Sequence, residues 1–226
     1  MKPKLLFVVT EDWAFLSHRL HLAKAALEDG YEVALLSRVS DHEERLKNNG
    51  IKVINWSIQR GSLNPIREIQ AIWQVFLVVR RFDPDLFHAV AWKPIIYSSL
   101  ACKLNGVKKR GFALGGLGPV FRSENILDKI LRPILILAFR FAHAGKLSRL
   151  IVQNVDDQKK LCMLNMIETE RTHLIRGAGV DTKIFYSLPE PHGIPLVVLP
   201  ARLQWEKGVR EFIAAARIIK EKNIDA

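Results

Sequence analysis

The sequence is poor in cysteine and has no long apolar run. Its two cysteines, Cys102 and Cys162, lie in apolar helical patterns and form no CxxC pair. This excludes a disulfide framework or a structural zinc site and fits a reducing compartment. No apolar run approaches the roughly 18 to 20 residues that cross a membrane, and the first residues lack the apolar core and cleavage site of a signal peptide. We therefore expect a cytoplasmic protein without a membrane-spanning segment.

Several catalytic motifs are also missing. The chain contains no HExxH pair, no P-loop and no GxSxG turn, so neither a metal centre nor Ser/His/Asp hydrolysis is supported. No GxGxxG fingerprint follows the first predicted strand, which argues against an NAD-dependent Rossmann enzyme. The sequence therefore predicts neither a metal nor a cofactor.

Positive charge is abundant and unevenly placed. The net charge is +11, and residues 60–150 hold 15 Lys and Arg against 5 Asp and Glu. Such a surplus attracts nucleic acid, phosphorylated ligands or an acidic membrane surface. A basic nucleic-acid-binding module is one alternative. The basic residues, however, alternate with aliphatic rather than aromatic side chains, and no nucleic-acid reader motif is present, so we expect no nucleic-acid partner.

Apolar segments alternate with amphipathic segments along most of the chain. Continuous apolar runs predict buried parallel strands, and the spacing between them predicts crossover helices. The predicted strands cover residues 4–10, 32–38, 51–56, 85–90, 109–114, 150–153 and 172–176. Among the predicted helices are 15–29 and 65–82. We expect a complete doubly wound α/β domain over residues 1–187.

A short break and a second start follow this domain. Residues 188–195 are rich in proline and carry one glycine, which is typical of a linker. Residues 196–226 then show one further strand, 196–201, and one helix, 209–222. A single strand and helix cannot bury both faces of a sheet, so we expect only the start of a second domain.

Ligands of open parallel sheets bind beyond the carboxyl ends of the strands. His88 lies near the end of the fourth strand, where an imidazole suits acid/base work or a hydrogen bond to a sugar hydroxyl; a histidine satisfied by the backbone is the alternative. Lys93 precedes Pro94 at a helix start. A cation there suggests a bound anion, because the helix dipole disfavours it; a solvated loop lysine is the alternative.

Two turns add candidates. Gly116 and Gly118 lie in a glycine-rich loop after the fifth strand, where the backbone either approaches a ligand closely or makes a plain tight turn. Arg202 and Lys207 flank the turn before the last helix, with Gly208 at its start. Two cations near a helix N-terminus form a diphosphate site or are simply solvated.

The segment 125–146 mixes basic residues with many large aliphatic ones. This composition is typical of an interfacial helix lying on an anionic membrane. It also fits a core helix whose cations extend to the solvent. Both interpretations stay open at this point.

Six segments together resemble one family. They are TEDWAFLSHR at 10–19, the strand carrying His88, GLGPVF at 116–121, QNVDD at 153–157, LIRGAGVD at 174–181 and ARLQWEKGV at 201–209. The chain resembles the retaining glycosyltransferases of family four, which have the GT-B fold. It is most similar to the branch that extends lipid-linked or surface polysaccharides.

The resemblance implies that the two domains bind different substrates. The first domain would bind a glycan or polyprenyl-diphosphate-linked acceptor, with Lys93, Gly116 and Gly118 in the acceptor cleft. The second would bind a UDP- or GDP-sugar donor, with Arg202 and Lys207 on its diphosphate. The histidine beside the donor sugar, taken as catalytic, would be His88. Fixed cations would replace a metal, and transfer would retain the anomeric configuration at the inner face of the cell membrane.

The chain departs from the family pattern in two places. Residues 12–15 stand where many relatives carry a glycine pair, so we assign no phosphate contact to that loop. The acidic E-x7-E motif of the second domain is absent from the sequence. We therefore expect the chain to be inactive alone. A stand-alone acceptor- or lipid-binding domain that pairs with a separate donor subunit is the remaining alternative.

Overall fold

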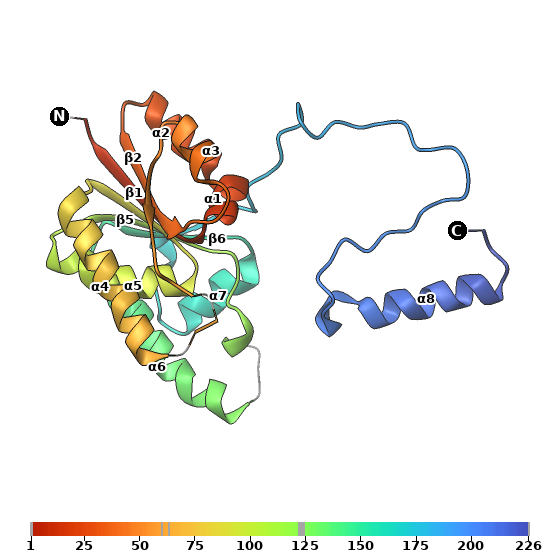
Figure 1. Ribbon diagram of the computed structural model, residues 1–226. Helices are drawn as coiled ribbons and strands as arrows, with labels where there is room; N and C mark the ends of the chain where they lie inside the picture. Colours follow the sequence, from red (N-terminus) through yellow and green to blue (C-terminus); the bar gives the residue numbers. More distant parts are fainter. Residues whose placement is uncertain (1, 60, 63, 122–124, 226) are drawn as a thin grey trace. The chain divides into compact units, whose positions relative to one another are not determined.

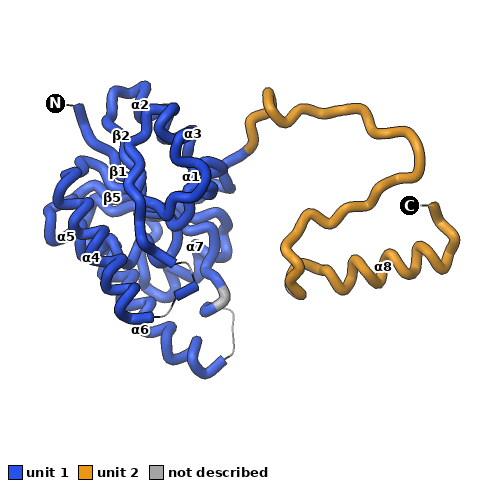
Figure 2. The backbone as a smooth tube through the Cα atoms, in the orientation of Figure 1, with its two compact units in different colours: residues 1–179 blue, residues 180–226 orange. Residues whose placement is uncertain are grey.

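The computed structural model describes residues 2–59, 61–62, 64–121 and 125–225. The chain divides into two compact units, residues 1–179 and 180–226 (Figure 2). This division precedes the segment predicted as a linker, 188–195, and the domain assignment itself stays a prediction. Each unit is described separately.

The described residues of unit 1 form a sheet of seven parallel strands in the order β3-β2-β1-β4-β5-β6-β7 (Figure 1). The strands are β1 (Lys4–Glu11), β2 (Glu32–Arg38), β3 (Lys52–Asn55), β4 (Leu86–Val90), β5 (Lys109–Leu114), β6 (Ser148–Val152) and β7 (Thr172–Leu174). The chain first builds outward from β1 to β3, then returns to place β4 on the other side of β1. The strand order therefore reverses between β1 and β4.

Helices join successive strands. They are α1 (Asp12–His18), α2 (Leu20–Glu28), α3 (Glu43–Asn48), α4 (Pro65–Phe82), α5 (Trp92–Leu104), α6 (Ile126–His143) and α7 (Val155–Met163), with short 3₁₀ turns η1 (Pro119–Phe121) and η2 (Thr169–Arg171). Apolar residues of α1, α2 and α3 pack on one face of the sheet, and those of α4 to α7 pack on the other.

The strand β1 shows why its sequence is continuously apolar. Leu6 and Val8 belong to the core beneath α4 and α5, whereas Leu5 and Phe7 belong to the core beneath α1 to α3. Successive side chains of a strand point to opposite faces, so a central strand with both faces covered needs apolar residues at every position.

The start of α4 follows its local sequence closely. Asn64 is the N-cap, and its side chain accepts hydrogen bonds from the backbone N–H of Ile66 and Arg67, while Pro65 occupies the first helical position. Such a cap satisfies N–H groups that have no partner within the helix. The predicted helix 65–82 is confirmed.

The single helix predicted over residues 15–29 is wrong. The chain forms α1 and α2 instead, joined at Arg19, whose φ of −135° and ψ of −11° leave the helical region. Phe15 and Ala23 are both fully buried against the sheet. On an unbroken helix these two residues would point about 80° apart; in the structure α1 turns Phe15 and α2 turns Ala23 toward the core.

Unit 2 contains η3 (Trp205–Lys207) and α8 (Val209–Glu221). The strand predicted over 196–201 is not formed, and residues 195–200 have no regular structure. Leu196, Val197 and Val198 are exposed, and none of the side chains described on α8 is buried. A parallel strand needs a neighbour for its backbone hydrogen bonds, and the described residues of this unit supply none.

Candidate functional site

The reversal of strand order between β1 and β4 marks the expected ligand edge of the sheet. In open α/β sheets, ligands bind beyond the carboxyl ends of the strands at such a switch point. In unit 1 the strands at this point are followed by α1 after β1 and by α5 after β4 (Figure 1). The two helix starts and the side chains beside them make up the candidate site.

The backbone is strained where β4 meets α5. Ala91 has φ 79° and ψ 166°, a region that residues other than glycine rarely adopt. Its N–H donates to the carbonyl of Ala113 on β5 at 2.9 Å, so strand pairing holds it in place. Strained residues of this kind concentrate at functional sites.

His88 lies on β4, two residues before the strand ends. By strand alternation its side chain lies on the sheet face that α1, α2 and α3 cover. The residue is 9% exposed, and its ring meets Phe7 edge-on at 5.3 Å between centroids. A Cβ at Gly111 would come within 3.2 Å of the imidazole Nδ1, so the glycine makes room for the ring. The buried Nε2 has no hydrogen-bond partner among the described residues.

The surroundings of His88 fix its charge. Burial, and in second place the positive charge of Arg19, lower the pKa of His88 to about 3. The imidazole is therefore neutral near pH 7. A neutral ring buried in this way suits a hydrogen bond to a substrate better than proton transfer near neutrality.

Two carboxylates lie where β1 meets α1, and both have partners within the protein. Glu11 pairs with Arg38 at 2.9 Å. Asp12 is fully buried and accepts hydrogen bonds from the backbone N–H and hydroxyl of Ser40 at 2.7 and 2.8 Å, and from the N–H of Trp13. Burial raises the pKa of Asp12, but these hydrogen bonds outweigh it and the pKa lies below its ordinary value. The carboxylates thus tie the start of α1 to the segment after β2.

Lys93 contacts the protein rather than open solvent. Its Nζ lies 3.0 Å from both carboxylate oxygens of Glu68 on α4, and it donates to the carbonyls of Ser62 at 2.7 Å and Gln59 at 3.2 Å. The hydroxyl of Tyr97 also donates to Glu68. The anion that the sequence pattern suggested is therefore supplied by Glu68, and the predicted contact of Lys93 with an acceptor remains untested.

The glycine-rich loop after β5 approaches polar side chains closely. A Cβ at Gly116 would lie 3.7 Å from Oδ2 of Asp157, and one at Gly118, where φ is 74°, would lie 3.9 Å from Nε1 of Trp92. Asp157 is buried and accepts from the amide of Asn154 at 2.8 Å. The indole N–H of Trp92 has no partner among the described residues. Carboxylate, amide and indole groups of this kind bind sugars well.

The predicted site residues separate into two groups. His88, Lys93, Gly116 and Gly118 all belong to β4, β5 and the segments that follow them in unit 1. Lys207 lies in η3 and Arg202 just before it; both are exposed and belong to unit 2. Their share in a site with unit 1 stays a prediction.

Sequence reasoning missed the parts of the site that depend on long-range packing. Asn154 and Asp157 lie in the QNVDD segment, but nothing in their spacing places them beside Gly116. Arg19 lies in the TEDWAFLSHR segment, yet a helix predicted across it concealed its position at the break.

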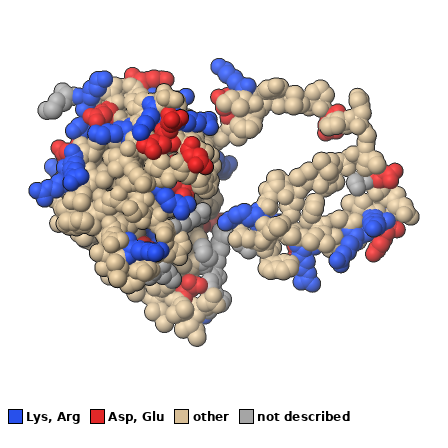
Figure 3. All heavy atoms as spheres, viewed as in Figure 1, with Lys and Arg blue, Asp and Glu red and all other residues tan. Residues whose placement is uncertain are grey.

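One helix presents apolar side chains to the solvent. The large apolar side chains that α6 exposes are 42% to 76% accessible to solvent. They are Ile126, Leu127, Ile130, Leu131, Ile134, Leu137 and Phe141. Figure 1 shows the first turns of α6 extending from the rest of unit 1, and in Figure 3 that end carries few charges on the face in view. No helix in the described part of the chain is long and apolar enough to cross a membrane.

Comparison with known proteins supports the topology. A family model described as "Glycosyl transferase 4-like" matches residues 4–154. A glycosyltransferase from Rickettsia africae has a similar structure, with a TM-score of 0.67, 18% identity and 97% of this chain covered, against 58% of that chain. HepE from Anabaena, solved with UDP and glucose, gives a TM-score of 0.58 at 16% identity over 83% of this chain and 47% of that one. These neighbours have the GT-B fold, and the predicted fold class is confirmed.

A curated relative comes from Campylobacter jejuni. It is the N,N'-diacetylbacillosaminyl-diphospho-undecaprenol alpha-1,3-N-acetylgalactosaminyltransferase, 25% identical over 92% of this chain. The chain spans 60% of the length of that relative. The family match runs from β1 through β6 to the N-cap of α7, and so includes His88 and the glycine-rich loop. Because this match covers more than half of the sequence, the chain belongs to the glycosyl transferase 4-like family.

Proposed function

We propose that the chain is the acceptor-binding part of a retaining glycosyltransferase that uses a UDP- or GDP-sugar and a polyprenyl-diphosphate-linked saccharide. The observation that carries the proposal is the family match over β1 to β6, together with the polar groups around the glycine-rich loop. The Campylobacter relative is named for transfer to a diphospho-undecaprenol-linked saccharide, and HepE was solved with UDP and glucose.

In this proposal the acceptor sugar lies against the loop of Gly116 and Gly118. Asp157 and the indole N–H of Trp92 hydrogen-bond its hydroxyl groups, because both lie within reach of that loop. His88 stays neutral and lies beside the donor sugar. Arg202 and Lys207 stabilise the negative charge on the leaving diphosphate, which is where charge develops in the transition state.

The same proposal places α6 on the inner surface of the membrane. Its exposed aliphatic residues would enter the headgroup region, while the basic residues Lys129 and Arg140 of the same helix attract anionic lipids. The helix follows η1, and η1 follows the glycine-rich loop. A lipid-linked acceptor entering from the membrane would therefore meet the predicted acceptor cleft directly.

Acceptor binding tests the proposal without requiring turnover. A short-chain prenyl-diphosphate-linked saccharide is titrated into the chain by calorimetry, and we expect saturable binding that Gly116→Val abolishes. A Cβ at Gly116 meets Asp157 without backbone strain, whereas a Cβ at Gly61 meets nothing within 4 Å, so Gly61→Val is the matched control. Equal binding by the wild type and both variants would reject the assigned cleft.

Transfer is measured separately with a panel of UDP- and GDP-sugars. Product formation by the chain would contradict the expectation that it is inactive alone. Acceptor binding without transfer, unchanged after a donor-domain polypeptide from a relative is added, would favour the stand-alone binding domain.

A further inference from the structure

Arg19 occupies a special position in unit 1. It is the one residue between α1 and α2, and its backbone leaves the helical region while its N–H still donates to the carbonyl of Phe15 at 2.8 Å. Figure 1 shows α1 directly after β1, at the edge of the sheet where the candidate site lies. Arg19 therefore lies at the end of the helix that follows β1, at the break between α1 and α2.

Two buried nitrogen atoms near this break have no partner among the described residues. One is Nε of Arg19, and the other is Nε2 of His88. Phe7 links the two sites: its ring lies 5.3 Å from that of His88 and 5.2 Å from that of Phe15, whose carbonyl accepts from Arg19. His88 therefore lies on the sheet face that α1 and α2 cover, and Arg19 joins those two helices.

The charge of Arg19 reaches His88. Burial is the main reason why the pKa of His88 is low, and the guanidinium is the second. Burial also lowers the pKa of Arg19 itself. A guanidinium keeps its proton under such conditions, so the site holds a permanent positive charge beside a neutral imidazole.

No carboxylate in the described ranges of the chain forms an ion pair with Arg19. The two nearest acidic residues in sequence are engaged elsewhere, Glu11 by Arg38 and Asp12 by Ser40. The guanidinium of Arg19 donates a hydrogen bond to the carbonyl of the adjacent His18 at 2.8 Å. A partly buried cation without a counter-ion is unfavourable, so an anion from outside the protein would complete the site.

We propose that Arg19 and His88 together bind a phosphate group of a substrate, Arg19 through its charge and His88 through a proton on Nε2. The proposal rests on the proposed transferase function and adds to it a phosphate contact within unit 1. The phosphate comes either from the nucleotide-sugar donor or from the diphosphate that links the acceptor to its lipid. Both sources share the same chemistry, and binding measurements separate them.

The test uses the whole chain, with histidine labelled by ¹⁵N so that the ring nitrogens of His88 are observed directly. Inorganic diphosphate is titrated first, followed by UDP and by geranyl diphosphate as a soluble prenyl diphosphate. We expect saturable binding that shifts the His88 ring signals. Whichever of UDP and geranyl diphosphate binds more tightly than inorganic diphosphate identifies the source.

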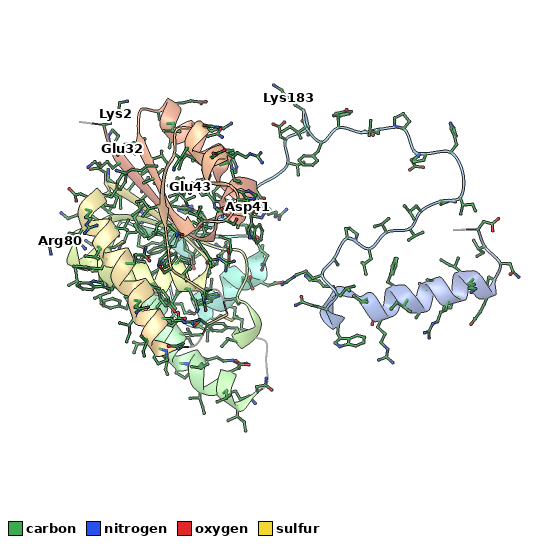
Figure 4. All side chains as sticks on the ribbon, viewed as in Figure 1. Lys2, Glu32, Asp41, Glu43, Arg80 and Lys183 are labelled. Carbon is green, nitrogen blue, oxygen red and sulfur yellow. The ribbon has the colours of Figure 1, made fainter. Side chains whose placement is uncertain are left out.

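Substitutions decide the role of Arg19. Arg19→Gln should weaken diphosphate binding by about ten- to hundredfold, the loss expected for one charge-assisted hydrogen bond, and Arg19→Lys should weaken it less. Arg80→Gln is the matched control, because Arg80 is exposed at the end of α4 and points outward in Figure 4. Circular dichroism checks that each variant is folded. If Arg19→Gln does not fold, the binding of Arg19→Lys is compared with that of the wild type instead.

Two results would overturn the proposal: absence of saturable binding to the wild type, or an equal effect of Arg19→Gln and Arg80→Gln. Neither depends on turnover. Diphosphate binding that requires Arg19, in a protein that transfers no sugar even after a donor-domain polypeptide from a relative is added, would leave this site standing and reject the transferase. Sugar transfer that does not require Arg19, in a chain that does not bind diphosphate, would support the transferase and reject this site.

Discussion

Replacing Lys93 by methionine separates two roles of this residue. The side chain would keep most of its apolar stem but lose the ammonium group that contacts Glu68, Ser62 and Gln59. Glu68 would then keep the hydroxyls of Tyr97 and Ser62 as side-chain partners. The substitution therefore removes the contact that joins α4, α5 and the segment before α4.

The size of the effect follows from burial. Removing one partner of a fully buried ion pair costs about 3 to 5 kcal/mol, and an exposed pair contributes about 0 to 1 kcal/mol. The side chains of Lys93 and Glu68 are 25% and 17% exposed, which places this pair between the two limits. We expect a loss of about 2 kcal/mol, equivalent to a decrease in Tm of roughly 4 to 8 °C for a unit of this size.

Thermal unfolding followed by circular dichroism measures this loss, with Glu68→Gln and the double variant completing a mutant cycle. Lys47→Met is the matched control, because Lys47 pairs with Glu43 on the surface of α3 with both side chains about half exposed; we expect under about 0.5 kcal/mol there. An unchanged Tm for Lys93→Met, together with lost acceptor binding, would refute the structural role and support the predicted acceptor contact.

Further predictions concern protonation, membrane binding and the glycine-rich loop. Burial is the main cause that lowers the pKa of His88 and of His143 to about 3, so protonation favours the unfolded chain, whose histidines titrate near 6.5. The free energy of unfolding is therefore highest above about pH 6.5 and decreases as the pH falls toward 3, by about 2 kcal/mol per histidine at pH 5. Urea unfolding at pH 7 and pH 5 measures this decrease, and equal stability at the two pH values would contradict the buried neutral state. Leu137→Glu on α6 should weaken binding to anionic vesicles in a sedimentation assay without lowering Tm. The control is Leu104→Glu on α5, which should bind like the wild type; Leu104 is 66% exposed and Leu137 68%. Equal binding by all three proteins would leave α6 without a membrane role. Gly118→Ala should lower the free energy of unfolding by about 1 kcal/mol, because φ is 74° there, and an unchanged Tm would show that the loop relaxes freely.

The regular elements of unit 1 were largely predictable because their signals are local. The strands 32–38 and 109–114 and the helix 65–82 have the predicted bounds. Each is specified by side-chain periodicity and by residues next to it, such as Asn64 and Pro65 at the start of α4. Periods of 2 and 3.6 residues and capping side chains act over a few residues, so no knowledge of distant segments was needed.

The tertiary structure decided what depends on segments far apart in sequence. The helix breaks at Arg19, with Phe15 before the break and Ala23 after it both in the core, and Lys93 is neutralised by a carboxylate on another helix. The segment 196–201 has the sequence of a strand, yet it is not one, because strand pairing requires a neighbour and residues 180–225 supply none. Residue type and local spacing thus determined the elements and the candidate His88, whereas long-range packing determined which polar groups are satisfied and which remain available to a ligand.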